Sequence, residues 1–418
     1  MREMKDSGVK WIGEIPVTWN VYRNKNAFVC SKDLVGGKSS ETQLLSLTTK
    51  GIKLKDINNA EGKLPESFDT YQYVKKDEMV MCLFDLDCSA VFSGLSPYDG
   101  MISPAYKVLT CTDRMEPKYA DYWFQYISHG RKFNHYAKNI RYTLSYEEFS
   151  ALPMLFPDRE EQIRISNYLD AKCSKIDEII EKQLSIIEKL KEYKLSIITE
   201  AVTSGINPDV EMKDSGSVWF GNIPINWEMK RLKYVFHIQK DIAGEEGHTV
   251  LSITQRGIIP KDFSNNEGQF ANSYANYQLV HKGDFAMNHM DLLTGWVDIS
   301  KYEGVTSPDY RVFVLNDKNG MCPKYYLYMM QMCYSARIFY GLGQGVSGMG
   351  RWRLQADKFL NFYIPIPPYD EQKKIADYIT DKVNHIEVEI DKRNKLIKKY
   401  QEYKKSLIYE VVTGKKEV

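Results

Sequence analysis

The sequence predicts a mixed α/β protein in which two similar domains are joined by two long antiparallel coiled-coil helices, with an internal pseudo-twofold repeat. Three observations lead to this prediction. The second half of the chain repeats motifs of the first, short apolar runs bounded by turn residues recur within each half, and each half ends in a long heptad pattern.

The duplication is clearest at the start of each half. Residues 4–8 and 212–216 are both Met-Lys-Asp-Ser-Gly, a shift of 208, and Trp, Gly, Ile-Pro and Trp follow at equal spacing in both copies. Further matches occur at shifts of 204 to 210, such as Glu161-Gln162 with Glu371-Gln372. Small length changes between shared motifs indicate surface loops on a common scaffold, where binding residues tend to lie.

Each domain is expected to combine short strands with a helix. Short runs rich in Val, Ile, Phe and Tyr and bounded by turn residues predict strands, such as those at Met79 to Phe84 and at Phe285 to Asn288. A helix is predicted from Tyr119 to Arg131 and another from Tyr325 to Arg337, because a proline stands just ahead of each apolar pattern.

Two long helices are predicted where apolar residues follow a seven-residue repeat. The seam positions are Leu169, Ile176, Gln183 and Leu190 in the first helix and Ile379, Ile386, Arg393 and Tyr400 in the second. Each helix would contain about 45 residues and extend roughly 65 Å. Neither can bury its seam alone, so we expect an antiparallel pair with a domain at each end. The alternative is two unrelated, solvent-covered helices.

Two polar seam residues, Gln183 and Arg393, lie near the middles of these helices. They are equivalent by the shift of 210, and an antiparallel pair would bring them together. A polar pair at one seam layer fixes the register at some loss of stability.

The predicted helix ends set the domain boundaries. Asp158 and Glu161 have the spacing of a capping box, and Gly205 and Gly414 stand where the helices would end. The expected divisions are a first domain at 1–157, a central helix at 158–205, a second domain at 206–367 and a C-terminal helix at 368–414.

Composition limits the classes of partner and compartment. The 418 residues include 56 basic and 55 acidic side chains, a net charge of +1, so any basic surface must be local. The seven cysteines form no C-x-x-C pair, and their odd number favours a reducing cytoplasm over a disulfide framework. No stretch of about 18 apolar residues occurs, so we expect no membrane partner.

The order of the duplicated motifs resembles the specificity subunits of type I restriction-modification systems. The likeness rests on Lys5 to Gly8 followed by Trp11 to Pro16 and Trp19, on Ile364 to Gln372, and on the helix ends Glu200 to Thr203 and Glu410 to Thr413. It covers nearly the whole chain. The first half departs from it at Leu155 to Asp158, which lacks the proline-rich sequence found before the second helix.

This resemblance implies a DNA-recognition subunit without catalytic residues. Its two target-recognition domains would each bind one half of a split, asymmetric double-stranded DNA site, with the helices setting the distance between them. Two methyltransferase subunits and two restriction motor-nuclease subunits would dock on it and would use S-adenosylmethionine, ATP and Mg²⁺. Two alternatives stay open: a coiled-coil scaffold that binds only proteins, and a self-contained nuclease or methyltransferase.

Two kinds of loop are the candidate DNA contacts. A basic residue beside an aromatic one precedes the last strand of each domain, next to a glycine-rich loop in the second, and a polar turn follows an apolar strand. The candidates are Lys50, Lys138, Asn139, Arg141, Tyr142, Gln255, Arg256, Gln344, Ser347, Arg351, Trp352 and Arg353. The alternative for each is a solvated turn residue. The tryptophans at 11, 19, 219 and 227 belong to the repeated frame, so we expect them in the core.

Motifs that suggest chemistry are incomplete. Pro367-Pro368-Tyr369 resembles an adenine-methyltransferase signature but follows Ile366, which cannot hold an amino group. The Gly36 to Ser39 segment lacks the first glycine of a P-loop. Asp209 to Lys213 crowds nuclease-type residues into one linker, and the histidines and cysteines show no zinc spacing. We therefore expect neither catalytic residues nor a metal site.

Overall fold

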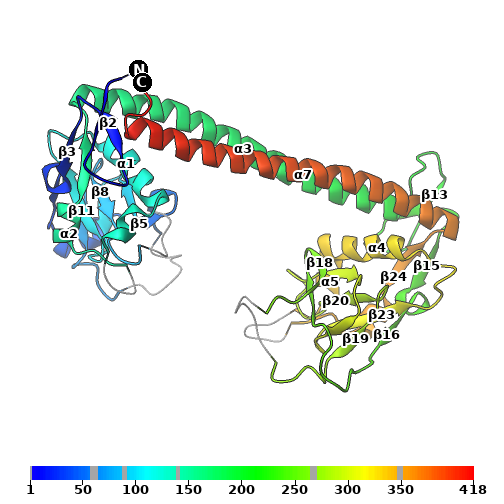
Figure 1. Cartoon of the computed structure of the whole chain (residues 1–418). Coiled ribbons are helices and arrows are strands. Elements are labelled where there is room, and N and C mark those ends of the chain that lie inside the picture. The colour runs from blue at the N-terminus through cyan, green and yellow to red at the C-terminus, as the bar shows by residue number, and fades with distance from the viewer. Residues whose placement is uncertain (1, 57–64, 87–91, 138–141, 264–270, 346–351) are drawn as a thin grey trace. The chain divides into compact units, whose positions relative to one another are not determined.

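The computed structural model describes residues 2–56, 65–86, 92–137, 142–263, 271–345 and 352–418. The chain divides into two compact units, of which the first combines Met1–Gln183 with Asn394–Val418 and the second is Leu184–Arg393. Each unit contains one mixed α/β domain and parts of two long helices, α3 (Arg159–Ser204) and α7 (Tyr369–Val412) (Figure 1). Each unit is therefore assembled from both halves of the sequence repeat.

The first domain is built on a four-stranded antiparallel sheet with strand order β4-β11-β8-β9. Its strands are β4 (Phe28–Cys30), β8 (Met79–Met81), β9 (Ser93–Leu95) and β11 (Lys107–Cys111). Four antiparallel pairs surround it: β1 (Met4–Asp6) with β2 (Glu14–Pro16), β3 (Asn20–Arg23) with β12 (Pro153–Phe156), β5 (Leu45–Thr48) with β6 (Gly51–Leu54), and β7 (Gln72–Val74) with β10 (Gly100–Ile102). The domain's helices are α1 (Pro117–His129) and α2 (Tyr146–Ala151).

The second domain repeats this plan, with a sheet of order β16-β23-β20-β21. These strands are β16 (Phe236–Gln239), β20 (Phe285–Met287), β21 (Val297–Ile299) and β23 (Arg311–Leu315). The surrounding pairs are β13 (Met212–Asp214) with β14 (Asn222–Pro224), β15 (Glu228–Arg231) with β24 (Tyr363–Ile366), β17 (Leu251–Thr254) with β18 (Gly257–Pro260), and β19 (Gln278–Val280) with β22 (Gly304–Thr306). The helices are α4 (Pro323–Ser335), α5 (Ile338–Leu342) and α6 (Ala356–Asn361).

The predicted fold class is confirmed, with small shifts at the ends of elements. Helices α1 and α4 begin at the proline itself, because proline at the first helical position gives up no hydrogen bond. They end before Arg131 and Arg337, whose φ values of 47° and 57° place both residues in the left-handed region and end the helical hydrogen bonding. Trp19 and Trp227 are fully buried, as expected, whereas Trp219 is 42% exposed.

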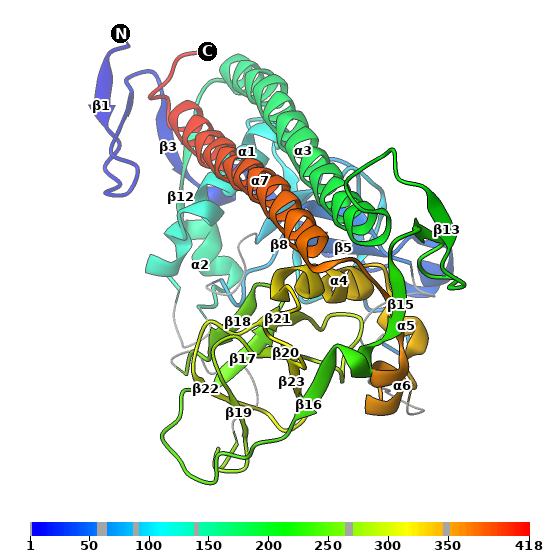
Figure 2. The same ribbon diagram turned by 90° about the vertical axis from the view of Figure 1, so that its right-hand side faces the viewer.

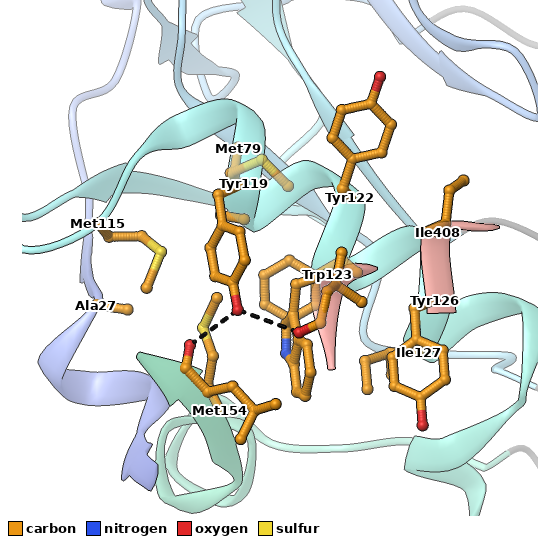
Figure 3. Close-up of a cluster of buried hydrophobic side chains, with 14 of the residues drawn as sticks. Ala27, Met79, Met115, Tyr119, Tyr122, Trp123, Tyr126, Ile127, Met154 and Ile408 are labelled. Carbon is orange, nitrogen blue, oxygen red and sulfur yellow. Dashed lines mark hydrogen bonds between the residues drawn. The ribbon is translucent and has the colours of Figure 1, made fainter. Parts of the chain in front are cut away.

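A buried tyrosine fastens each domain to a helix end. The Tyr119 hydroxyl in α1 lies 3.4 Å from a carbonyl oxygen of β12 and 3.4 Å from that of Val412 in α7 (Figure 3). The Tyr325 hydroxyl in α4 lies 3.1 Å from a carbonyl of β24 and 3.3 Å from that of Val202 in α3. Burial raises the pKa of both phenols far above the usual value, so both remain hydrogen-bond donors. Each domain thus holds the C-terminal end of the long helix that follows the other domain in the sequence.

A buried glutamine fixes the start of each long helix. Gln162 and Gln372 each donate to the carbonyl of a proline just ahead of the helix, at 2.9 Å in both cases. Each also accepts the backbone N–H of the residue that precedes α1 or α4, at 2.8 and 2.9 Å. The repeated glutamine of the Glu-Gln motif is therefore explained by its structural contacts.

The long helices run antiparallel within each unit (Figure 2). In the first unit, Lys404 donates to Asp177 at 2.7 Å, and the ammonium of the later residue Lys416 lies 5.9 Å from the ring of the earlier residue Tyr168. In the second unit, Lys194 of α3 donates to Glu387 of α7 at 2.6 Å. Apolar side chains of both helices join each domain core, so helix pairing and domain folding stabilise each other.

The predicted seam positions are the shielded ones. All eight side chains are buried or half-buried: Leu169, Ile176, Gln183, Leu190, Ile379, Ile386, Arg393 and Tyr400. Gln183 and Arg393 belong to different units, so the contact expected between them stays a prediction.

Candidate nucleic-acid interface

The same exposed turn joins β5 to β6 and β17 to β18. Thr48 Oγ1 accepts the N–H of Lys50 at 3.1 Å, and Thr254 Oγ1 accepts the N–H of Arg256 at 3.1 Å. Gly51 and Gly257 complete the two turns with φ values of 89° and 105°, a left-handed conformation that favours glycine. One backbone geometry thus presents an exposed lysine in the first domain and an exposed arginine in the second.

The residue before the basic side chain also differs between the domains. Gln255 is exposed, and its side-chain amide donates to the carbonyl of Thr294 at 3.3 Å, which orients it. The first domain has Thr49 at this position. Gln and Arg side chains can contact adenine and guanine edges in the major groove, respectively, whereas Thr and Lys offer different groups. The turns therefore have a common frame and different hydrogen-bonding chemistry.

A second candidate region lies before the last strand of each domain. Lys138, Asn139 and Arg141 of the first domain, and Ser347 and Arg351 of the second, lie outside the described residues. Tyr142 is 38% exposed with a φ of 44°, and its carbonyl accepts the N–H of Leu86 at 3.3 Å. This backbone bond holds the tyrosine at the surface of the first domain.

In the second domain, Gln344 and Arg353 are brought together by the backbone. The N–H of Gln344 donates to the carbonyl of Arg353 at 2.9 Å, and the reverse bond is 3.1 Å. The Gln344 side chain accepts from Gln355 at 2.8 Å. Both Gln344 and Arg353 are exposed, and their backbone pairing sets an amide-bearing residue beside a guanidinium-bearing one.

Trp352 packs against residues 340–345. Its ring stacks on Tyr340 at 5.1 Å between centroids, and its Nε1 donates to the Tyr340 carbonyl at 2.5 Å. A Cβ atom on Gly343 or Gly345 would lie 2.5 or 2.4 Å from this ring. Glycine at these two positions is therefore explained by the contact with the tryptophan ring.

Gln344 and Arg353 also line a pocket of about 740 Å³ in the second domain. Its other cationic residues are Lys240, just after β16, and Arg311, at the start of β23; the described lining contains neither Asp nor Glu. His289, just after β20, completes its polar lining together with other glutamines. The pocket is thus a local basic site in a chain of near-zero net charge.

Sequence reasoning missed several pocket residues, among them Lys240, Arg311 and His289, because they lie in strands of the sheet or just after them. Arg311 is only 5% exposed; burial lowers its pKa to about 10, which leaves it charged at neutral pH. Burial, with the nearby charges of Arg311 and Arg353, lowers the pKa of His289 to about 3, so its ring is neutral. An arginine opening the otherwise apolar β23 was the signal available in the sequence.

Two absences hold for the described part of the chain. Within it, no group of three or more His, Cys, Asp or Glu side chains could hold a metal ion. Among its helices, none is long and apolar enough to span a membrane.

Comparison with known proteins gives matches to specificity subunits of type I restriction enzymes. Residues 224–399 match the family model for the type I restriction modification DNA specificity domain. The type I restriction enzyme MjaVIII specificity subunit of Methanocaldococcus jannaschii is 26% identical over 287 residues, covering 64% of this chain and 63% of that protein. The putative MjaX specificity subunit of the same organism is 24% identical over 176 residues, covering 38% and 40%. The matches thus span less than two thirds of these relatives.

The fold also has a solved counterpart. A chain from a structure concerned with complex assembly and conformational transition of the type I R-M system aligns with a TM-score of 0.68 at 11% identity. The alignment covers 96% of this chain and 99% of that chain. At this identity, the likeness shows a shared fold over nearly the full length.

Proposed function

The chain belongs to the family of type I restriction-modification specificity subunits, and on this premise we propose that it recognises a two-part, asymmetric double-stranded DNA sequence. One observation supports this most directly: the two domains hold the same exposed turn in the same geometry but present Lys50 in one and Arg256 in the other. Two similar domains that present different side chains suit the recognition of two different half-sites. Linking them raises affinity only when the half-sites are correctly spaced.

We propose that partner subunits supply the chemistry. In this proposal two methyltransferase subunits dock on equivalent surfaces, and two restriction subunits join for cleavage. Tyr193 in α3 and Tyr403 in α7, equivalent by the shift of 210, support paired docking because they are 57% and 52% exposed. S-adenosylmethionine, ATP and Mg²⁺ would be bound by the partners. The Pro-Pro-Tyr segment of this chain instead leads into α7, and the side-chain amide of Gln372 donates to the carbonyl of Pro367 at 2.9 Å.

The decisive experiment is methylation mapping of genomic DNA from cells that express the methyltransferase subunit with or without this chain. We expect one two-part adenine-methylated motif that disappears when the chain is absent. Arg256→Ala should change the preference in one half of that motif, and Lys50→Ala in the other. Lys282→Ala, an exposed change outside the candidate residues, is the matched control.

The outcomes separate DNA recognition from the scaffold alternative. A methylation pattern that does not depend on the chain, with partner expression verified, would support a scaffold that binds only proteins. If both turn variants altered both halves equally, the assignment of one half-site to each domain would be wrong.

A further inference from the structure

The pocket of the second domain has an unbalanced positive charge. Its cationic side chains are Lys240, Arg311 and Arg353, and no carboxylate is present among its described lining residues. Lys240 and Arg353 are exposed at its rim, whereas Arg311 is buried. Within the described residues, none of the three side chains has a carboxylate within ion-pair distance. The pocket therefore attracts anions.

Arg311 is the strongest indication that the pocket suits an anion. Its guanidinium donates to the Leu354 carbonyl at 2.8 Å, lies 3.9 Å from the Met287 sulfur, and stacks 5.1 Å from the ring of Phe359. A carbonyl, a thioether and a ring solvate a guanidinium only partly, and a buried charge is normally paired. A ligand oxygen would supply the pairing that the described protein groups do not.

His289 adds a neutral polar group to the same lining. Its Nδ1 is buried and has no hydrogen-bond partner among the described residues. Because the ring is neutral, it can donate or accept a hydrogen bond without adding charge. An unpaired buried ring nitrogen is expected to gain a partner when a polar ligand binds.

The size and remaining walls indicate more than a bare phosphate. The volume of about 740 Å³ falls within the usual range for small-molecule sites. Ile242, Met290 and Tyr310 contribute apolar and aromatic walls. Such walls suit the sugar and base of a nucleotide, while the cationic side suits its phosphate.

We propose that this pocket binds a nucleotide, with its phosphate held by Arg311, Lys240 and Arg353 and its sugar and base against the apolar walls. The nucleotide could be one unit of a DNA strand or a free nucleotide. The first source rests on the proposed DNA-recognition function, whereas the second does not.

The first domain lacks two of these features, which makes the site specific to the second domain. Strand pairing aligns Arg311 with Lys107, because each lies opposite the last methionine of its neighbouring strand. At the positions equivalent to His289 and Arg353, the first domain has Leu83 and Thr143. A nucleotide site in one domain alone would add to the asymmetry of the protein.

The test uses the full chain and two probes, AMP and a duplex that contains the mapped motif, with binding measured by calorimetry and anisotropy. Lys240→Met and Arg353→Met change exposed side chains and should preserve the fold. Losing one charged hydrogen bond to phosphate should weaken binding about tenfold. Lys282→Met removes the same charge elsewhere in the domain and should leave binding unchanged. Arg311→Met, checked for folding by circular dichroism, should give the largest loss.

AMP binding that is weakened by the rim variants would identify a free nucleotide as the ligand. Failure of AMP, with duplex binding weakened about tenfold and its dependence on salt reduced, would identify a strand phosphate. If neither probe responds to any pocket variant, the pocket proposal is overturned, while motif-specific duplex binding would still support DNA recognition. If the wild-type chain and its partners bind no duplex, DNA recognition fails, and the AMP result decides the pocket separately.

Discussion

Replacing Tyr325 by phenylalanine should destabilise the second unit without changing its shape. The substitution removes one hydroxyl that lies 3.1 and 3.3 Å from two carbonyl oxygens, and the side chain is fully buried. A buried acceptor left without a partner costs roughly 1 to 3 kcal/mol. We expect a loss of about 2 kcal/mol in the free energy of unfolding, since the two carbonyls share the single O–H donor and both lose it. Tyr119→Phe should cost less, because its two distances are both 3.4 Å.

Urea unfolding of the full chain, followed by amide hydrogen exchange, measures this loss and localises it. With a denaturant slope of about 3 kcal/mol per molar, the second unit's midpoint should fall by roughly 0.7 M. Exchange should accelerate at the end of α3, which contains Val202. Tyr302→Phe is the control, because that side chain is 41% exposed and should change stability by less than about 0.5 kcal/mol. Equal midpoints for Tyr325→Phe and Tyr302→Phe would refute the argument that the hydroxyl anchors the helix.

Three further predictions follow from the helices, the loop and the pocket. Inserting one heptad at equivalent positions of α3 and α7 lengthens each helix by about 10 Å and should widen the preferred gap between half-sites by roughly 3 base pairs. Methylation mapping measures this gap, and an unchanged gap would contradict the spacer role. Gly345→Ala should lower stability in urea by about 1 to 3 kcal/mol, because its Cβ would lie 2.4 Å from Trp352. In a Trp352→Val background the same substitution should cost much less, and an equal cost in both backgrounds would be the contrary result. The pKa of His289 is lowered from 6.5 to about 3, so the folded state binds fewer protons than the unfolded state and loses stability as the pH falls from about 6.5 towards 3. Urea midpoints at pH 7 and pH 4.5 should therefore differ less for His289→Leu than for the wild-type chain. Identical pH profiles would argue against a buried neutral ring.

The frame could be predicted from the sequence because the same physical pattern occurs twice. Heptad spacing locates Leu169 and Ile379 in seams that neither helix can bury alone, and both are fully buried in the structure. Tyr119 and Tyr325 recur at equivalent positions, but their role could not be predicted. Each hydroxyl contacts a carbonyl of a distant helix end, and such long-range contacts leave no local periodic signal.

The site could be predicted only in part, for a different reason. Lys50 and Arg256 stand out in the sequence because they occupy matching turns between short strands, where exposure is expected. Arg311 and His289 do not, because an isolated polar residue in or near an apolar strand resembles a surface-facing residue of a half-buried strand. Only the structure shows Arg311 buried and His289 with an unpaired nitrogen.

The repeat in the sequence and the division in the structure do not coincide, and this difference bears on function. The sequence repeats as domain plus following helix, whereas each compact unit contains a domain, the start of one long helix and the end of the other. Tyr119 holds Val412, and Tyr325 holds Val202, so neither domain completes its core from its own half of the chain. Changes to exposed turn residues leave these anchors untouched. In the proposed function, the half-site preferences of the two domains can therefore diverge, while the helix pairing proposed to set their spacing stays constrained.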